Sequence, residues 1–220
     1  MESLLIKDKM RKILLLLFVF ALVACDKSKV SNIAIIKVND IPDTCVILNK
    51  WQVLGPFSSN NKEHFINEDN LQLFKYKESG ISFLDFMRIG CRSRLSSDTI
   101  KLDSCFRNKY VFSGKIPLDF NEILKVSKEK LKGNVYCACL ILSKKNISTR
   151  LHFSSTGAEK IWLNGKLICS TDYSKPLGSY TQFIPIELKQ GQNVLLVKVN
   201  KLYTDWQMYA RLENESPTAL

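Results

Sequence analysis

Short apolar runs that end at polar turns follow one another along the chain after residue 32. In the second half, β-branched and alternating residues predict strands at 135–142, 149–154, 158–163, 166–169, 183–188, 194–199 and 206–212. The dipeptide Asn164-Gly165 between two of these runs predicts a tight hairpin turn, because both residues tolerate positive φ. Closely spaced strands without a long amphipathic helix predict an all-β sandwich or barrel.

The first half of the chain has a weaker pattern. Apolar runs predict strands at 33–38, 45–54, 81–89, 98–102 and 109–112. The polar stretch 58–77 predicts a surface excursion between strands. Residues 119–132 have the best helical spacing, with Phe120, Ile123 and Leu124 on one side, and predict one short crossover helix.

The N-terminus has the pattern of a targeting segment. A basic stretch that ends at Arg11-Lys12 precedes an unbroken apolar run of 12 residues, 13–24. A helix that spans a membrane needs about 20 apolar residues, so this run is too short to be read as one. Basic residues, a short apolar run and a small residue before the cleavage point are typical of a signal peptide.

The apolar run ends in Leu22-Val23-Ala24-Cys25, which resembles the lipobox of bacterial lipoprotein precursors. The resemblance implies cleavage before Cys25 and lipidation of that cysteine, which would anchor the chain to a membrane at about 0.8 kcal/mol for each buried methylene. The alternatives are an ordinary secretory signal or an uncleaved anchor, with Cys25 there by chance. Asp26 resembles the inner-membrane retention signal of enteric bacteria, but other phyla sort lipoproteins differently, so both membranes of the envelope stay open.

The chain is basic, with 32 Lys and Arg against 21 Asp and Glu and a formal net charge of +11. Without residues 1–24 the balance is 28 against 19, or +9. An exported lipoprotein would rarely meet nucleic acid, so we assign this excess to a solvated or membrane-facing surface and expect no nucleic-acid partner. The two histidines exclude a His-rich metal centre, and we expect no cofactor.

Six cysteines remain besides Cys25: Cys45, Cys91, Cys105, Cys137, Cys139 and Cys169. There is no C-x-x-C pair, which disfavours a zinc ribbon or a thioredoxin-like site. On one strand, Cys137 and Cys139 point to the same face and cannot bond to each other without distortion. Buried free thiols are the first interpretation, and one or more disulfides are the alternative.

Two segments resemble the galactose-binding-like jelly-roll module, the sugar-binding domain type of family 2 glycoside hydrolases. They are 154–166, which ends in Ile161-Trp162-Leu163-Asn164-Gly165-Lys166, and 188–199, which contains Gly191-Gln192-Asn193. The stretch from Trp51 to Gly55-Pro56-Phe57 resembles the opening of a subset of these modules. The resemblance implies a jelly-roll β-sandwich, with Ile161, Leu163 and alternate residues of 194–199 pointing inward. It specifies fold more strongly than function.

These patterns divide the chain into a signal peptide (1–24), a lipidated cysteine with a polar tether (25–32), N-terminal strands (33–50), a galactose-binding-like sandwich (51–213) and a tail (214–220). The loop before the Asn164-Gly165 hairpin often carries acidic residues in this family, but here it reads Ser154-Ser155-Thr156-Gly157. We therefore expect no metal there.

Catalytic patterns are weak. There is no nucleophile elbow, and His64 and His152 are interpreted as surface or interface residues, although His152 shares a strand face with Arg150 and Ser154. Nothing selects a pair of carboxylates for glycoside hydrolysis, and no phosphate-binding glycine motif occurs. We therefore expect no enzymatic activity.

Sugar binding requires aromatic faces that stack on a pyranose ring and planar polar groups for its hydroxyls. The predicted loops offer candidates for one patch at one end of the sandwich: Tyr173, Tyr180, Tyr203, Asp205 and Trp206. The alternative for Trp206 is a core position in register with Met208, Ala210 and Leu212, and Trp51 and Trp162 are expected to pack in the framework.

Two functions from different classes follow. The first is a non-catalytic, lipid-anchored envelope protein that binds carbohydrate through its jelly roll. The alternative is a structural module that docks another envelope protein and has no sugar ligand. An exposed aromatic groove would favour the first, and a contiguous apolar patch with few aromatics the second. The basic charge favours acidic partners in either case.

Overall fold

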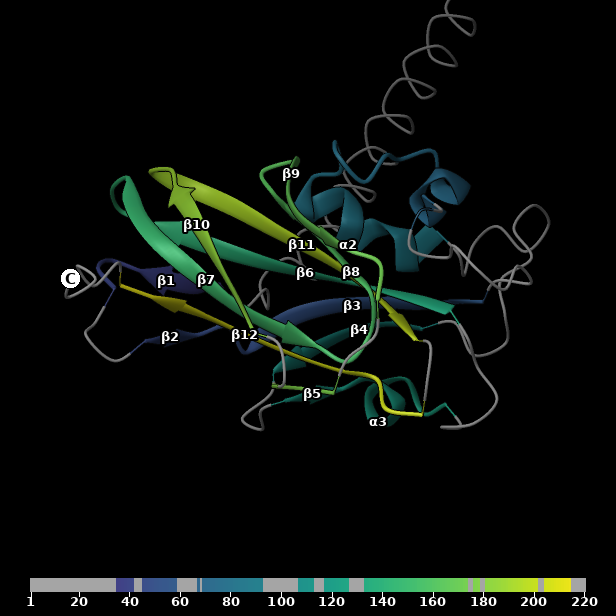
Figure 1. The fold of residues 1–220 in the computed structure, drawn as a ribbon. Coiled ribbons are helices and arrows are strands. Elements are labelled where there is room, and N and C mark those ends of the chain that lie inside the picture. The colour runs from purple at the N-terminus through teal and green to yellow at the C-terminus, as the bar shows by residue number, and fades with distance from the viewer. Residues whose placement is uncertain are drawn as a thin grey trace, which may run out of the picture. The chain divides into compact units, whose positions relative to one another are not determined.

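A computed structural model describes residues 35–41, 45–58, 67, 69–92, 107–112, 117–126, 133–173, 176–178, 181–201 and 204–214. Their strands form two packed sheets (Figure 1), which confirms the predicted all-β sandwich. The expected signal peptide and tether, together with the expected strand 98–102, lie outside these residues. None of the helices in the described ranges is long and apolar enough to cross a bilayer.

The larger sheet has the strand order β4-β3-β6-β11-β8-β9, and β1 pairs in parallel with β6. Its strands are β1 (Ile36–Val38), β3 (Lys50–Ser58), β4 (Arg107–Phe112), β6 (Gly133–Ser143), β8 (Glu159–Leu163), β9 (Lys166–Thr171) and β11 (Gly191–Lys201). The long pair β6 and β11 forms its centre, and the described part of β6 is buried almost throughout. Such near-continuous burial requires cover on both faces.

The smaller sheet has the order β10-β7-β12-β2, and β5 also pairs with β12. Its strands are β2 (Val46–Ile47), β5 (Leu118–Asp119), β7 (Ile147–Ser155), β10 (Gln182–Leu188) and β12 (Gln207–Glu213). Along β12, buried and half-buried residues alternate, so only one face of this strand packs on the core. The segment 33–50, expected as N-terminal strands, thus contributes β1 to one sheet and β2 to the other.

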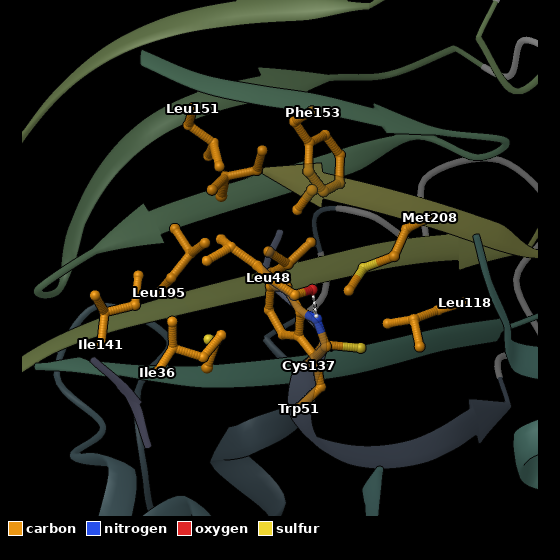
Figure 2. Packing of buried hydrophobic residues seen from close by; sticks show 14 of the residues in the cluster. Ile36, Leu48, Trp51, Leu118, Cys137, Ile141, Leu151, Phe153, Leu195 and Met208 are labelled. Atoms are coloured by element: carbon orange, nitrogen blue, oxygen red, sulfur yellow. Dashed lines mark hydrogen bonds between the residues drawn. The ribbon is translucent and has the colours of Figure 1, made fainter. Parts of the chain in front are cut away.

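The core lies between the two sheets. Figure 2 shows Leu151 and Phe153 of β7 facing Trp51 and Cys137 of the larger sheet across this layer. The indole Nε1 of Trp51 donates to the backbone oxygen of Leu48 at 2.6 Å, so its polar atom is satisfied while the ring is fully buried. The framework position expected for Trp51 is therefore confirmed. Alternate residues of β8 and β11 point into the same core, as the resemblance implied: Ile161, Leu163, Leu195, Val197 and Val199.

The hairpin turn has the predicted backbone. Asn164 and Gly165 have φ of 51° and 80° between β8 and β9. The Asn164 side chain also contacts the turn at Gly191-Gln192-Asn193. Its Nδ2 donates to Asn193 Oδ1 and its Oδ1 accepts from the Val194 amide, both at 2.9 Å. Asn193 in turn accepts from the amide of Lys189. The two motifs therefore close one end of the sandwich together.

The predicted crossover helix is present as α3 (Phe120–Leu124), with Asp119 as its N-cap. The expectation of a strand at 81–89 is wrong, because this segment forms the helix α2 (Phe83–Arg92). Ser82 and Asp85 form a reciprocal cap in which Ser82 Oγ accepts from the Asp85 amide at 3.1 Å and donates to Asp85 Oδ2 at 2.7 Å. Buried Phe83, Phe86 and Ile89 also have helical spacing.

Residues 69–92, here called the cover segment, contain the 3-10 helix η2 (Asn70–Phe74) and α2 and lie on the outer face of the larger sheet. Outward-facing Tyr136 of β6 accepts from the Asn70 amide at 3.1 Å and donates to Glu78 Oε1 at 2.6 Å. Glu78 also pairs with the fully buried Lys198 of β11 at 2.8 Å. Burial lowers the pKa of Lys198, although the Glu78 carboxylate opposes that shift, and burial next to Glu78 raises the pKa of Tyr136. Buried polar contacts therefore attach the cover segment.

The described cysteine side chains are Cys45, Cys137, Cys139 and Cys169. Of these, Cys45, Cys137 and Cys139 are free thiols, and Cys169 Sγ donates to Gln182 Oε1 at 2.6 Å. Cys137 and Cys139 share the core face of β6, as expected, and burial raises the pKa of both. High pKa values keep these thiols protonated and unreactive, so they act as small apolar side chains. The side chains of Cys91 and Cys105 lie outside the described part.

Candidate functional site

The loop residues expected to bind sugar are only partly within the described structure. Tyr173 has 44% of its surface exposed, and Asp205 is exposed. Tyr180 and Tyr203 lie outside the described residues. The expectation for Trp206 as a stacking residue is wrong, because its side chain is fully buried. Its ring packs on Phe120 at 5.6 Å, and its Nε1 donates to the Val199 oxygen at 3.3 Å.

Trp206 is buried because side chains along β12 alternate between the core and the outer face. Inward positions repeat every second residue, and Trp206 precedes buried Met208, Ala210 and Leu212 in that series. The core alternative for Trp206 is therefore the correct one.

The described loops do meet at one end of the sandwich. Thr156 Oγ1 donates to the backbone oxygen of Asp205 at 3.1 Å, which joins the loop after β7 to the loop before β12. Thr171, the last residue of β9 and two residues before Tyr173, accepts from the Glu159 amide at 3.3 Å at the start of β8. A joint aromatic patch of these loops stays a prediction.

A second group of polar and aromatic residues lies on the outer face of the smaller sheet. We call it the open face and define it by the outward residues of three adjacent strands: Arg150, His152 and Ser154 of β7, Phe183 of β10, and Tyr209, Arg211 and Glu213 of β12. Between them, Leu151, Phe153, Ala210 and Leu212 point into the core. Strand alternation therefore places one polar set outside and one apolar set inside.

Cross-strand register brings residues of this face together. His152 of β7 lies opposite Phe183 of β10 on one side and opposite Arg211 of β12 on the other. Arg211 is in turn opposite Ile47 of β2, whose side chain is exposed. Neighbouring strands are about 4.8 Å apart, so this row of four residues extends over roughly 14 Å.

The open face carries aromatic rings at its surface. Phe183 has 54% of its surface exposed, although a phenyl ring usually prefers burial. Its centroid lies 4.7 Å from that of His152, with the ring planes 31° apart. Tyr209 meets the other side of the cluster, 5.5 Å from His152 in an edge-to-face arrangement. His152 therefore packs against the Phe183 ring and limits its rotation.

A carboxylate orders the charged groups. Glu213 Oε1 accepts from His152 Nδ1 at 2.9 Å and also pairs with Arg211 Nη2. Burial alone would raise the pKa of Glu213, but the His152 hydrogen bond and Arg211 outweigh it, so the pKa is lowered. Glu213 therefore stays ionised and can only accept, which makes His152 Nδ1 the donor.

Arg211 and Tyr209 complete this network. The guanidinium of Arg211 lies 5.5 Å from the centre of the Tyr209 ring. Burial opposes the charge of Arg211, yet its neighbours Tyr209 and Glu213 raise its pKa. The pKa of Tyr209 is also raised, with burial as the largest cause. Arg211 is thus a permanent cation and Tyr209 a neutral hydroxyl over the accessible pH range.

A shallow hollow of about 300 Å³ adjoins these rings. It is lined by Pro117, His152, Ser154, Leu177, Gly178, Thr181, Tyr209 and Arg211. The Gly178 amide donates to Ser154 Oγ at 3.0 Å, so the loop that carries Tyr173 closes over one side of it. The hollow combines apolar walls with a few polar groups, which is the usual composition of a small-molecule site.

The sequence contained a signal for this site. The sequence places Arg150, His152 and Ser154 on one strand face and predicts the strand 206–212, but it does not show that these two strands pair. Tyr209, Arg211 and Glu213 repeat the same polar–apolar alternation about 60 residues later. Two strands that alternate in this way and carry charged residues on the outer positions predict an open sheet face. Only pairing shows that these two are neighbours.

A larger cavity of about 650 Å³ lies between the β8–β9 hairpin and β10. Leu163, Ile168 and Ile186 form apolar parts of its lining, and Lys166 and Lys189 lie at it as well. In the described residues, no group of three or more His, Cys, Asp or Glu is arranged to hold a metal ion.

No protein-family model matches the sequence, and no curated protein matches it. A β-glucosidase from Kluyveromyces marxianus is 12% identical with a TM-score of 0.41, over 50% of this chain and 14% of that chain. A β-glucuronidase from Ruminococcus gnavus is 12% identical with a TM-score of 0.44, over 81% of this chain and 31% of that chain.

A family 35 carbohydrate-binding module from Clostridium thermocellum is 18% identical with a TM-score of 0.30, over 37% of this chain and 71% of that chain. The chain thus matches less than a third of the length of either enzyme. At these identities and TM-scores, the similarities establish neither a family nor a ligand, and the architecture rests on the sheets themselves.

Proposed function

We propose that this protein is a non-catalytic, lipid-anchored envelope protein that binds carbohydrate on the open face of its smaller sheet. The observation that carries the proposal is Phe183, an exposed ring held in place by stacking on His152. Sugars pack their apolar C–H faces on such rings, and a rigid ring loses little freedom when a ligand binds.

The surrounding groups supply the polar half of a sugar site. Arg211, Tyr209 and Ser154 line the hollow beside Phe183 and His152, and they offer N–H and O–H groups at its rim. The hollow of about 300 Å³ is open on the outer face of the sheet, so the site suits one or two rings of a longer glycan.

The anchor rests on the sequence pattern that ends at Cys25. Metabolic labelling with an alkyne analogue of palmitate, followed by click detection, tests it. Wild-type chain should incorporate the label, and Cys25→Ser should not. Cys45→Ser is the matched control, because Cys45 lies in the described sandwich, well beyond the lipobox. Labelling that survives Cys25→Ser contradicts the anchor.

Carbohydrate binding is tested on a glycan array with the full chain in a non-glycosidic detergent, since sugar-based detergents would compete. We expect saturable binding to a defined glycan at 150 mM salt. Phe183→Ala should weaken it about tenfold or more, and Tyr173→Ala, in the loop after β9, about two- to threefold. Leu167→Ala removes an equally exposed apolar side chain from β9 and should change nothing.

Binding that disappears at moderate salt would show only the basic charge acting on polyanions. No binding to any glycan on the array would contradict the proposal. It would favour a protein partner, the second candidate function. The cavity between β9 and β10 is the observation that favours this second candidate, because two strands without a further partner in the described residues border its apolar lining.

A further inference from the structure

The charged groups of the open face are not equally neutralised. This face carries three charged side chains, Arg150, Arg211 and Glu213. Glu187 of β10 lies on the same side of the sheet, opposite Ser148 and two residue pairs beyond Arg150. Glu213 directs one oxygen to both His152 and Arg211. The charge of Arg211 is thus already balanced by a carboxylate.

Arg150 has no such partner in the described part of the chain. It is directly opposite Glu213 in the register of β7 and β12, yet Glu213 turns to Arg211 instead. The Nη2 of Arg150 makes one long hydrogen bond, 3.4 Å, to the backbone oxygen of Asn214, and its Nε makes none. Glu187 makes no ion pair with it. A guanidinium has five N–H donors. The Nε of Arg150 is buried, so the terminal NH2 groups are the ones that a ligand can reach.

Arg150 also contacts the Phe183 ring. Its guanidinium carbon lies over that ring, 5.9 Å from the ring centre. Phe183 is more than half exposed, so a sugar ring packed on it would have its substituents next to this guanidinium. Arginine binds a carboxylate with two parallel N–H···O bonds, and no neutral hydroxyl offers that geometry.

We propose that the ligand of the open face is an acidic sugar, a hexuronic acid residue whose ring packs on Phe183 and whose carboxylate pairs with Arg150. The inference rests on the proposed carbohydrate-binding function and names its ligand class. Because Glu213 already neutralises Arg211, Arg150 is the residue that would favour an acidic sugar over a neutral one.

The test compares each uronic acid with its own methyl ester, because the ester keeps the ring and removes only the charge. Full chain in non-glycosidic detergent is titrated calorimetrically at 150 mM salt with trigalacturonic acid, with a glucuronic acid trisaccharide, and with both methyl esters. We expect at least one acid to bind about tenfold or more tightly than its ester, as a charged hydrogen-bonded pair implies.

Four variants assign the effect. Arg150→Gln should weaken binding of the acid about tenfold or more and leave the ester within about twofold. The affinity of Arg150→Lys for the acid should lie between those of the wild type and Arg150→Gln, because lysine keeps the charge but cannot make two parallel N–H···O bonds. Lys144→Gln, in the exposed turn after β6, removes one positive charge elsewhere and should change neither. Phe183→Ala should weaken acid and ester alike.

The outcomes separate the two proposals. Equal binding of acid and ester, or equal loss of both in Arg150→Gln, overturns the acidic ligand and leaves carbohydrate binding in place. Glucose 6-phosphate is titrated beside monomeric glucuronic and galacturonic acid. If it binds as tightly as they do, a phosphorylated sugar replaces the carboxylate ligand. No binding of any acid or ester, together with a silent array, overturns carbohydrate binding itself.

Discussion

The outer faces of the two sheets differ in burial: one is covered by a further segment of the chain, and the other is exposed. The larger sheet is covered on its outside by residues 69–92, with Phe86 and Ile89 of α2 fully buried. The smaller sheet leaves Phe183, His152 and Arg211 at its surface. One face is therefore buried under a second layer, whereas the other is exposed to solvent.

The difference is visible in the strand sequences. The outward positions of β6 and β11 include Ala138 and Leu196, which are paired neighbours and almost fully buried. The corresponding positions of β7 and β12 include His152 and Arg211, which are also paired neighbours. Apolar pairs on an outer face require a second layer, whereas a charge is buried there at a cost unless a partner compensates it, as Glu78 compensates Lys198 on the covered face.

The largest expected effect comes from removing an apolar anchor of the covered face. Phe86→Ala should lower the free energy of unfolding by about 3–5 kcal/mol, because it leaves a cavity between α2 and the sheet. Leu84→Ala on the same helix is the control, since Leu84 is 48% exposed, and it should cost about 0.5 kcal/mol or less. Urea unfolding of both variants measures the difference. Equal costs would contradict burial of α2 against the sheet.

The buried ion pair of the covered face gives the next effect. Glu78→Gln leaves the buried Lys198 ammonium without its carboxylate and should destabilise the protein by about 3 kcal/mol. Lys198→Met should cost less, because an apolar side chain suits a site with no exposure. Chemical denaturation compares the two variants. A larger cost for Lys198→Met than for Glu78→Gln would show that the charge of Lys198 is not effectively buried.

The same phenyl-to-methyl change on the open face should have a much smaller effect on stability. Phe183→Ala loses the stacking on His152 and should cost about 0.5–1.5 kcal/mol. Urea unfolding alongside Phe86→Ala gives the direct comparison of the two faces. A cost as large as that of Phe86→Ala would mean that Phe183 belongs to the packing of the protein and would weaken its assignment as a ligand platform.

The smallest effect is a pH dependence that only the open face should show. His152 and Arg211 hold the folded-state pKa of Glu213 below its unfolded value of about 4.3. This carboxylate therefore contributes stability above about pH 5, and the contribution is lost as the pH falls through the folded-state pKa.

Glu213→Gln should remove that share, about 1 kcal/mol or less, and flatten the stability profile between pH 5 and the folded-state pKa. Urea midpoints measured across this range, with Glu122→Gln as an exposed control, give the result. A profile unchanged by Glu213→Gln contradicts the assigned network.

Local patterns predicted much of the fold and little of the site. The Asn164-Gly165 turn, the inward series of β8 and β11 and the helix near Phe120 follow from residues close in sequence, and the structure has all three. The apolar run 81–89 predicts a strand, whereas the structure has the helix α2 there. The Ser82 and Asp85 side chains form a cap that stabilises the start of this helix, and this cap is a signal that local sequence contains.

The sequence alone determined where strands run and which residues of each strand are apolar, because side-chain alternation is a property of a single strand. It also contained the pattern before Cys25 that resembles a lipobox, and the core series that includes Trp206. Only the tertiary structure decided that β7 and β12 are neighbours, that 69–92 covers one sheet, and that Arg150 lies beside Phe183 without a carboxylate partner in the described residues. These facts depend on pairing between segments far apart in the chain, where many arrangements satisfy the same local alternation and only packing and register select one.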